Sequence, residues 1–94
     1  MVMDFEWDAR KAAQNVAKHG VPFDYAARVF LDPRRLDTED MRFTYREQRW
    51  VTLGKISGRL FAVAYTLRGG VVRLISARKA NAREQRRYDE TLST

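Results

Sequence analysis

The sequence predicts a single α+β domain organised around an antiparallel β-hairpin. Arg59 to Ala80 contains two runs rich in aliphatic, β-branched and aromatic residues, separated by Gly69-Gly70. Such a pair of glycines, which tolerates φ > 0, is typical of a tight hairpin turn. The first third of the chain instead holds helix-forming residues between capping signals. A chain of 94 residues has room for one modest core, so we expect residues 1–94 to form one domain.

A short strand and a helix are expected at the N-terminus. Val2 to Trp7 alternates acidic and large apolar residues, which favours a strand. Asp8 is suited to cap a helix from Ala9 to His19, and Gly20 is suited to end it. The apolar stripe that we expect to face the sheet is shallow and consists of Ala9, Ala12, Ala13, Val16 and Ala17.

The remaining elements follow from turn and capping residues. A second helix is expected from about Phe23 to Leu31, where Asp32-Pro33 ends it. The polar stretch from Arg34 to Tyr45 predicts a ragged edge strand or a long loop. A strand within Arg46 to Ile56 is then joined through Ser57-Gly58 to the hairpin. After the hairpin, Asn81 is suited to cap a last helix, which is highly charged and has almost no apolar stripe.

The turn positions also predict the register of the strands. If Gly69-Gly70 is a two-residue loop, the expected cross-strand pairs are Arg68 with Val71, Thr66 with Arg73, Ala64 with Ile75, and Ala62 with Ala77. The Ser57-Gly58 loop similarly places Trp50 opposite Tyr65. Because side chains alternate between faces, this register puts Ser76 and Arg78 on the same face as Tyr65. Both faces are largely apolar, so we expect each to be covered at least in part.

The charge of the chain is positive and unevenly distributed. The net charge is +6, and 14 of the 18 basic residues are arginine. From Met41 onward, twelve basic residues oppose four acidic ones. Arginine binds phosphate and carboxylate through two parallel hydrogen bonds, so a polyanion or an acidic partner is the expected complement. The alternative is a solvated basic face without a specific partner.

Several classes of site are excluded or disfavoured by composition. The absence of cysteine excludes disulfides, thiolate zinc sites and cysteine nucleophiles. His19 is the single histidine, and its place before Gly20 favours a role at the helix C-terminus over one as general base. Asp37, Glu39 and Asp40 could bind a hard cation, but we expect them in a solvated loop. We therefore expect no metal and no cofactor.

Metal-free cleavage of RNA remains compatible with this inventory. The ribose 2′-OH is a built-in nucleophile, so an enzyme needs only to orient it and to stabilise charge on the phosphorane. Arginine, lysine and tyrosine suffice for this purpose. Trp50 and Tyr65 could stack on bases, although core packing is the alternative for both. The longest apolar run, Leu60 to Leu67, is too short to span a bilayer, and the N-terminus lacks signal-peptide features, so we expect a cytoplasmic protein without membrane contact.

The chain resembles BrnT-type toxins over nearly its whole length, from Phe5 to Tyr88. The resemblance is carried by F-E-W-D-A-R-K-A-A-Q-N-V-A-K-H-G-V-P-F-D-Y-A-A-R-V-F-L-D-P, by R-W-V-T-L-G, by G-R-L-F-A-V-A-Y-T-L-R and by V-R-L-I-S-A-R-K-A. Such proteins look like members of the RelE-like ribonuclease toxins. The resemblance implies that an N-terminal strand and two helices pack on an antiparallel sheet, with a C-terminal helix, and that RNA is cut on or beside the other face without metal.

The resemblance also implies partners and a site. A cognate antitoxin with a ribbon-helix-helix DNA-binding segment would neutralise the toxin and carry it to operator DNA. RelE-like toxins commonly have basic residues at the end of the last strand and a tyrosine downstream. The implied catalytic residues are therefore Arg73, Arg78, Lys79 and Tyr88, although the spacing to Tyr88 is longer than in RelE. The expected RNA-binding residues are Arg49, Trp50, Arg59, Tyr65 and Arg68.

A second class of function is also compatible with the sequence. The basic sheet could belong to a non-catalytic binding module that docks nucleic acid or an acidic protein. The two functions are distinguished by RNA integrity when the chain is expressed with and without its antitoxin.

Overall fold

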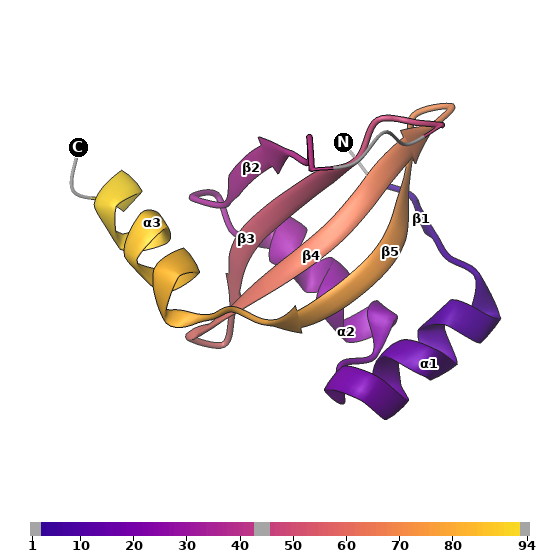
Figure 1. Cartoon of the computed structure of the whole chain (residues 1–94), viewed down its shortest axis with the longest axis horizontal. Coiled ribbons are helices and arrows are strands. Elements are labelled where there is room, and N and C mark those ends of the chain that lie inside the picture. Colours follow the sequence, from indigo (N-terminus) through magenta and orange to yellow (C-terminus); the bar gives the residue numbers. More distant parts are fainter. Residues whose placement is uncertain (1–2, 43–45, 93–94) are drawn as a thin grey trace.

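A mixed five-stranded sheet with helices on both faces forms the domain (Figure 1). The structure is a computed structural model, and it describes residues 3–42 and 46–92. The strands are β1 (Phe5–Glu6), β2 (Leu36–Glu39), β3 (Trp50–Ile56), β4 (Arg59–Arg68) and β5 (Val71–Lys79). Their order in the sheet is β1-β5-β4-β3-β2. The predicted α+β class is confirmed, with one addition: β1 pairs parallel with β5, whereas the other pairs are antiparallel.

Two helical segments cover one face of the sheet. The first is α1 (Ala9–His19), which begins at the predicted cap: the Asp8 carboxylate accepts hydrogen bonds from the backbone N–H groups of Arg10 and Lys11, at 2.9 and 3.0 Å. Gly20 ends this helix in the left-handed conformation, with φ of 71°. The second segment is α2 (Phe23–Ala26), which continues directly as the 3₁₀ helix η1 (Ala27–Leu31) and so fills the range predicted for one helix. Gly54 lets η1 approach β3 closely, because a Cβ there would lie 2.9 Å from the Cβ of Val29.

The last helix, α3 (Ala82–Leu92), lies on the opposite face at the far end of the sheet from β1 (Figure 1). The main core lies between the other helices and the sheet and includes Phe23, Val29, Val63, Leu74 and Ala77. A smaller core joins α3 to the sheet through Leu53, Leu60, Ala62 and Tyr88. Both faces of the sheet are thus covered in part, as predicted, but α3 leaves open much of the sheet face on which it lies. None of the described helices is long and apolar enough to cross a membrane.

The predicted register is confirmed near the turns and wrong beyond a bulge. Trp50 pairs with Tyr65, Arg68 with Val71, and Thr66 with Arg73. Beyond Tyr65 the register shifts, and the predicted pairs of Ala64 with Ile75 and of Ala62 with Ala77 are not formed. Ala64 instead pairs with Ser76, and Ala62 pairs with Arg78. The physical reason is a β-bulge at Ile75, which adds one residue to β5.

The bulge changes the face on which the last strand residues lie. Ala77 pairs with Val63 and joins the main core under the helices. Arg78 moves to the face that carries Ala62 and α3. The prediction that placed Ser76 and Arg78 on the same face as Tyr65 is therefore wrong, since one inserted residue exchanges the two faces.

The predicted contact surface of α1 is also wrong. Of the expected stripe, Ala12 is half-buried, whereas Ala9, Ala13, Val16 and Ala17 are exposed. The buried residue of α1 is Asn15. Its side-chain amide donates to the carbonyl oxygens of Ala77 and Val21, at 2.8 and 2.9 Å, and its oxygen accepts from the Ala77 N–H at 3.0 Å. Hydrogen bonding to the backbone of β5 therefore decides which side of α1 packs against the sheet.

Candidate functional site

A groove of about 630 Å³ lies between α3 and the segment that contains β2. Four arginines from three segments line it, namely Arg42, Arg78, Arg83 and Arg87. We call this feature the arginine groove. Three carboxylates, those of Glu39, Asp40 and Glu84, also line it. Val51 and Thr38, which pair across β3 and β2, form part of its floor, so the groove opens on the sheet face that α3 only partly covers.

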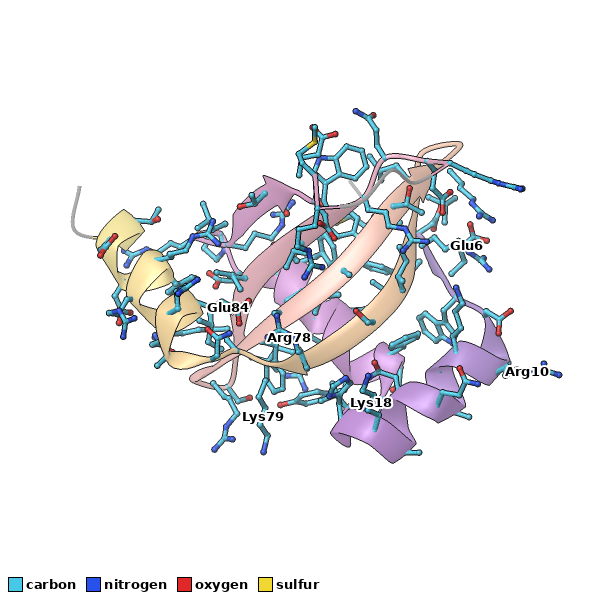
Figure 2. All side chains as sticks on the ribbon, viewed as in Figure 1. Glu6, Arg10, Lys18, Arg78, Lys79 and Glu84 are labelled. Atoms are coloured by element: carbon cyan, nitrogen blue, oxygen red, sulfur yellow. The ribbon has the colours of Figure 1, made fainter. Side chains whose placement is uncertain are left out.

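Arg78 is held at the groove by Glu84 through two parallel hydrogen bonds. Its Nη1 and Nη2 donate to Oε1 and Oε2 of Glu84 at 2.8 and 2.9 Å (Figure 2). These hydrogen bonds lower the pKa of Glu84 below its usual value and raise the pKa of Arg78. The Arg78 side chain remains 40% exposed. A guanidinium has five donors, so Arg78 can contact Glu84 and still offer N–H groups to a ligand.

Glu84 also completes the cap of α3. Its Oε1 accepts from the backbone N–H of Asn81 at 2.9 Å, while the Asn81 side chain accepts from the backbone N–H of Glu84 at 2.9 Å. This reciprocal pair is a capping box. The same carboxylate therefore starts the helix and orients Arg78, which ties the position of α3 to the end of β5.

The other three arginines differ in how they are partnered. Arg42 binds Asp40 through Nε at 2.9 Å and through Nη2 at 3.0 Å. Arg87 donates to the hydroxyl of Thr38 at 3.0 Å. Among the described residues, neither Arg83 nor Arg87 forms an ion pair. These two arginines are one helical turn apart on α3, where like charges repel, so an anion in the groove would relieve that repulsion.

The four predicted catalytic residues do not lie together. Arg78 lines the arginine groove. Arg73 lies further along β5, beside β1, with Nη1 3.5 Å from Oε2 of Glu6. Lys79 is exposed and pairs with Phe61, so it points to the opposite side of the sheet from Arg78 (Figure 2).

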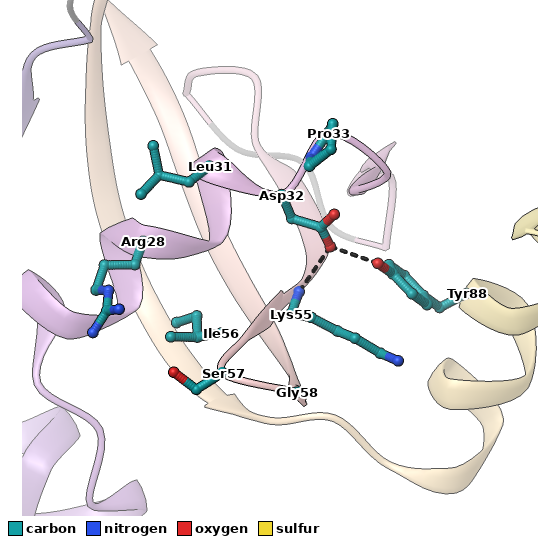
Figure 3. A pocket seen from close by; sticks show the side chains of 9 residues that line it. All are labelled: Arg28, Leu31, Asp32, Pro33, Lys55, Ile56, Ser57, Gly58 and Tyr88. Atoms are coloured by element: carbon teal, nitrogen blue, oxygen red, sulfur yellow. Dashed lines mark hydrogen bonds between the residues drawn. The ribbon is translucent and has the colours of Figure 1, made fainter.

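Tyr88 lies in a different place: its side chain extends from α3 toward Asp32 (Figure 3). The residue is buried, and its hydroxyl donates to Oδ2 of Asp32 at 2.6 Å. The backbone N–H of Lys55 donates to the same oxygen at 2.9 Å. Burial and the contact with Asp32 raise the pKa of Tyr88 to about 12. A separate cavity of about 360 Å³ adjoins this contact and includes Arg28 and Ser57, so the Tyr88 hydroxyl faces away from the arginine groove.

The five predicted RNA-binding residues are spread over both faces of the sheet. Trp50 and Tyr65 stack on the helix-covered face, with ring centroids 5.9 Å apart. Tyr65 is buried and donates to Oδ1 of Asp37 at 3.0 Å, and burial raises its pKa. Arg68 contacts Glu47 at 3.2 Å. Arg59 is exposed at the start of β4, and Arg49 precedes β3. None of the five lines the arginine groove, and their contribution to RNA binding stays a prediction.

The three acidic residues considered as cation ligands, Asp37, Glu39 and Asp40, each bind another side chain of the protein. Asp37 accepts from Tyr65, Glu39 accepts from Gln48 at 3.3 Å, and Asp40 binds Arg42. Within residues 3–42 and 46–92, no group of three or more His, Cys, Asp or Glu side chains is arranged to hold a metal ion.

Sequence reasoning missed Arg42, Arg83, Arg87 and Glu84. Two signals in the last helix point to three of them. Asn81 and Glu84 have the spacing of a capping box, and Arg83 and Arg87 have the i, i+4 spacing of one helix face. Arg42 follows the edge strand in sequence, and its place in the groove depends on tertiary packing.

The fold and the groove together define a small α+β protein that presents arginines on the partly open face of its sheet. The comparison with protein families identifies the group to which this protein belongs. The model of the family described as "Ribonuclease toxin, BrnT, of type II toxin-antitoxin system" matches residues 7–84, so the chain belongs to this family. The comparison with curated proteins gave no match. Family membership identifies the protein as a ribonuclease toxin of a type II toxin-antitoxin system.

Proposed function

We propose that the protein cleaves RNA in the arginine groove without a metal ion and thereby inhibits translation and growth. The observation that carries this proposal is the convergence of Arg42, Arg78, Arg83 and Arg87 from three segments on one groove. Arginine forks match the oxygens of a phosphodiester. Charge stabilisation of this kind is commonly the largest contribution to phosphoryl chemistry, which supports an enzymatic over a purely structural role.

In the proposed reaction, the 2′-oxygen of a ribose attacks the adjacent phosphorus. The bond from phosphorus to the 5′-oxygen of the next nucleotide then breaks, and the products are a 2′,3′-cyclic phosphate and a free 5′-hydroxyl. Solvent water accepts the proton of the 2′-OH and supplies the proton that the departing 5′-oxygen gains. Arg83 and Arg87 would bind the non-bridging oxygens, whereas Arg78, oriented by Glu84, would stabilise the charge of the phosphorane.

The remaining predicted residues have secondary places in this proposal. Arg73 lies on the same strand and face as Arg78 and would bind RNA outside the groove. Lys79 and Arg59 are exposed and would contribute long-range attraction. Tyr88 has no step in the proposed reaction, because its hydroxyl is bonded to Asp32; its predicted catalytic role is tested with Tyr88→Phe.

We further propose that the partner is a cognate antitoxin with a ribbon-helix-helix segment. Family membership supports an antitoxin partner. The antitoxin would neutralise the toxin in the cytoplasm, and contact with operator DNA would occur only through it.

The decisive experiment compares arginines of the same helix. Arg83→Ala and Arg87→Ala remove groove side chains, whereas Arg86→Ala removes an exposed arginine of α3 that does not line the groove. We expect each groove variant to lose about a hundredfold or more in RNA cleavage, and Arg86→Ala to retain cleavage. Circular dichroism checks folding, and EDTA is added to a parallel reaction.

Three results would contradict the proposal. Equal cleavage by all three variants would place the site elsewhere. Loss of cleavage in EDTA, restored by Mg²⁺, would overturn metal independence. If the wild-type protein binds RNA without cutting it, the runner-up function, a non-catalytic binding module, is supported instead.

A further inference from the structure

We propose that a cavity between α1 and the edge of β5 is a second phosphate-binding subsite, which extends the RNA-binding surface beyond the arginine groove. The cavity has a volume of about 240 Å³, and Lys11, Lys18, His19, Ile75 and Ser76 are among its lining residues. We call it the edge cavity. This inference rests on the proposed function, because it names how much of the RNA chain the protein binds.

The edge cavity exists because β1 is short. β1 pairs with Val72 and Arg73 of β5, and within residues 3–42 and 46–92 no other strand pairs with β5 on that side. The bulge at Ile75 lies beside this edge, and both Ile75 and Ser76 line the cavity. Asn15 binds the backbone of Ala77 through two hydrogen bonds, which fixes this side of α1 against the edge.

The position of Asn15 determines where the two lysines lie. Lys11 is four residues before Asn15 and Lys18 is three residues after it, so all three share one face of α1. The hydrogen bonds of Asn15 direct that face to β5, and both lysines line the cavity. Figure 2 shows Lys18 beside β5, whereas Arg10 of the same helix points away from the molecule.

The charges of the edge cavity favour an anion. In the part of the chain that the structure describes, no acidic side chain lines the edge cavity, whereas three carboxylates line the arginine groove. Asp8, at the start of α1, attracts Lys11 from outside the cavity. Among the described residues, neither Lys11 nor Lys18 forms an ion pair. The two lysines and Ser76 line one cavity, and ammonium and hydroxyl groups together match the oxygens of a phosphate group.

Because the edge cavity is continuous with the arginine groove, an RNA phosphate is favoured over a carboxylate of an acidic protein as the anion that binds there. Ser76 pairs with Ala64, and Arg78 pairs with Ala62. Ser76 and Arg78 therefore lie on the same face of β5, two residues apart, which is roughly 7 Å along a strand. A single-stranded RNA bound at Arg78 can therefore place a neighbouring phosphate at the edge cavity.

The test measures binding of 2′-O-methylated single-stranded RNA, which cannot be cleaved through its 2′-oxygen. Fluorescence anisotropy compares the wild type with Lys11→Gln/Lys18→Gln, with the charge-preserving Lys11→Arg/Lys18→Arg, and with Arg10→Gln as a control on the same helix. A dinucleotide, which has a single phosphodiester, and an oligonucleotide of about twelve nucleotides distinguish binding of one phosphate from binding along the whole surface. Circular dichroism verifies folding of each protein.

We expect the glutamine double variant to bind the longer RNA on the order of tenfold more weakly. Its salt slope should fall by about 1.4, because each lost contact removes about 0.7 for a single strand. The glutamine double variant should bind the shorter RNA as tightly as the wild type does. The arginine double variant and Arg10→Gln should bind both RNAs like the wild type. Equal losses in the glutamine double variant and Arg10→Gln would overturn the inference.

Two further outcomes separate this inference from the proposed function. If Arg83→Ala and Arg87→Ala abolish cleavage while the glutamine double variant binds long RNA normally, the groove is correct and the edge cavity is not a subsite. Retained RNA binding together with weaker binding of the antitoxin by the glutamine double variant would assign the edge cavity to an acidic protein and overturn the inference.

Discussion

Glu84 accepts two hydrogen bonds from Arg78, at 2.8 and 2.9 Å, and thereby joins the end of β5 to the first turn of α3. The same carboxylate caps the helix by accepting from the N–H of Asn81. Because Arg78 lies in the arginine groove, the start of α3 and the orientation of a proposed catalytic arginine depend on one side chain. Glu84 is therefore a positioning residue in the proposed mechanism.

Exchange of Glu84 for glutamine tests this role. Glutamine also serves at this position of a capping box, so Glu84→Gln preserves the cap but removes the charge and one acceptor for Arg78. We expect a loss of stability of about 1–2 kcal/mol and a fall in kcat of about tenfold or more, because the guanidinium is no longer held in place. Single-turnover cleavage and urea unfolding measure the two effects.

A double-mutant cycle supplies the control for Glu84. In an Arg78→Ala background, Glu84→Gln should have almost no further effect on kcat, since a positioning residue acts through its partner. Additive losses would show that Glu84 contributes to the chemistry independently. Asn81→Ala weakens the cap but leaves both acceptors of Glu84 for Arg78. It should therefore lower the free energy of unfolding and leave kcat almost unchanged.

The lowered pKa of Glu84 predicts a dependence of stability on pH. A group whose folded-state pKa is depressed stabilises the protein above its unfolded-state pKa, and that stability is lost as the pH falls through the folded value. Asp32 also has a lowered pKa: burial opposes the shift, but hydrogen bonds from Tyr88 and Lys55 outweigh it. The free energy of unfolding should therefore decrease on acidification below about pH 4.5.

Comparison with Glu84→Gln isolates the contribution of Glu84 to this dependence. Urea titrations at neutral pH and in acid should give a smaller decrease for Glu84→Gln than for the wild type, because the titrating group is absent. An identical decrease in both proteins would show that the carboxylate is not stabilised by Arg78 in the folded state.

Much of the fold followed from local sequence signals. Asp8 and Gly20 defined α1, the turn at Ser57-Gly58 fixed the pairing of Trp50 with Tyr65, and the turn at Gly69-Gly70 fixed the pairing of Arg68 with Val71. These features depend on backbone preferences of a few adjacent residues. The bulge at Ile75 has no comparable local signal, because it depends on how β5 meets both β4 and α1.

The site was less accessible to sequence reasoning for the same reason. The bulge moved Arg78 to the face of the groove, while Lys79 points to the other face. Arg83 and Arg87 become groove residues only because α3 packs against the sheet through Tyr88. The sequence thus indicated Arg78 as a candidate site residue but could not show which arginines lie near it in the groove.

Asn15 should be essential for stability, because it satisfies the backbone of the β5 edge. Asn15→Leu would leave the buried N–H and C=O of Ala77 and the carbonyl of Val21 without this partner. Unsatisfied buried groups cost about 1–3 kcal/mol each, so we expect a loss of at least about 2 kcal/mol. Urea unfolding measures it, and Gln14→Leu on the exposed neighbouring position is the control. A loss below about 0.5 kcal/mol would mean that water replaces the amide.

The last prediction concerns Tyr88, whose hydroxyl has both a structural and a catalytic interpretation. Its contact with Asp32 at 2.6 Å and its pKa of about 12 mean that the phenol stays protonated near neutral pH and is already bonded. We therefore expect Tyr88→Phe to reduce stability by about 1 kcal/mol and to leave kcat unchanged. Asp32 keeps hydrogen bonds from the backbone N–H groups of Lys55 and Arg34, so α3 should remain in place.

Two comparisons make the Tyr88 result decisive. Tyr88→Ala removes the buried ring and should cost about 3–5 kcal/mol, which would detach α3 and abolish cleavage through loss of the groove. Tyr88→Phe keeps the ring, so only the hydroxyl is tested. A folded Tyr88→Phe protein that cuts RNA about a hundredfold more slowly, while binding the uncleavable RNA normally, would assign the hydroxyl to proton transfer in the reaction. In that case α3 must shift during catalysis, because the hydroxyl faces Asp32 and not the arginine groove.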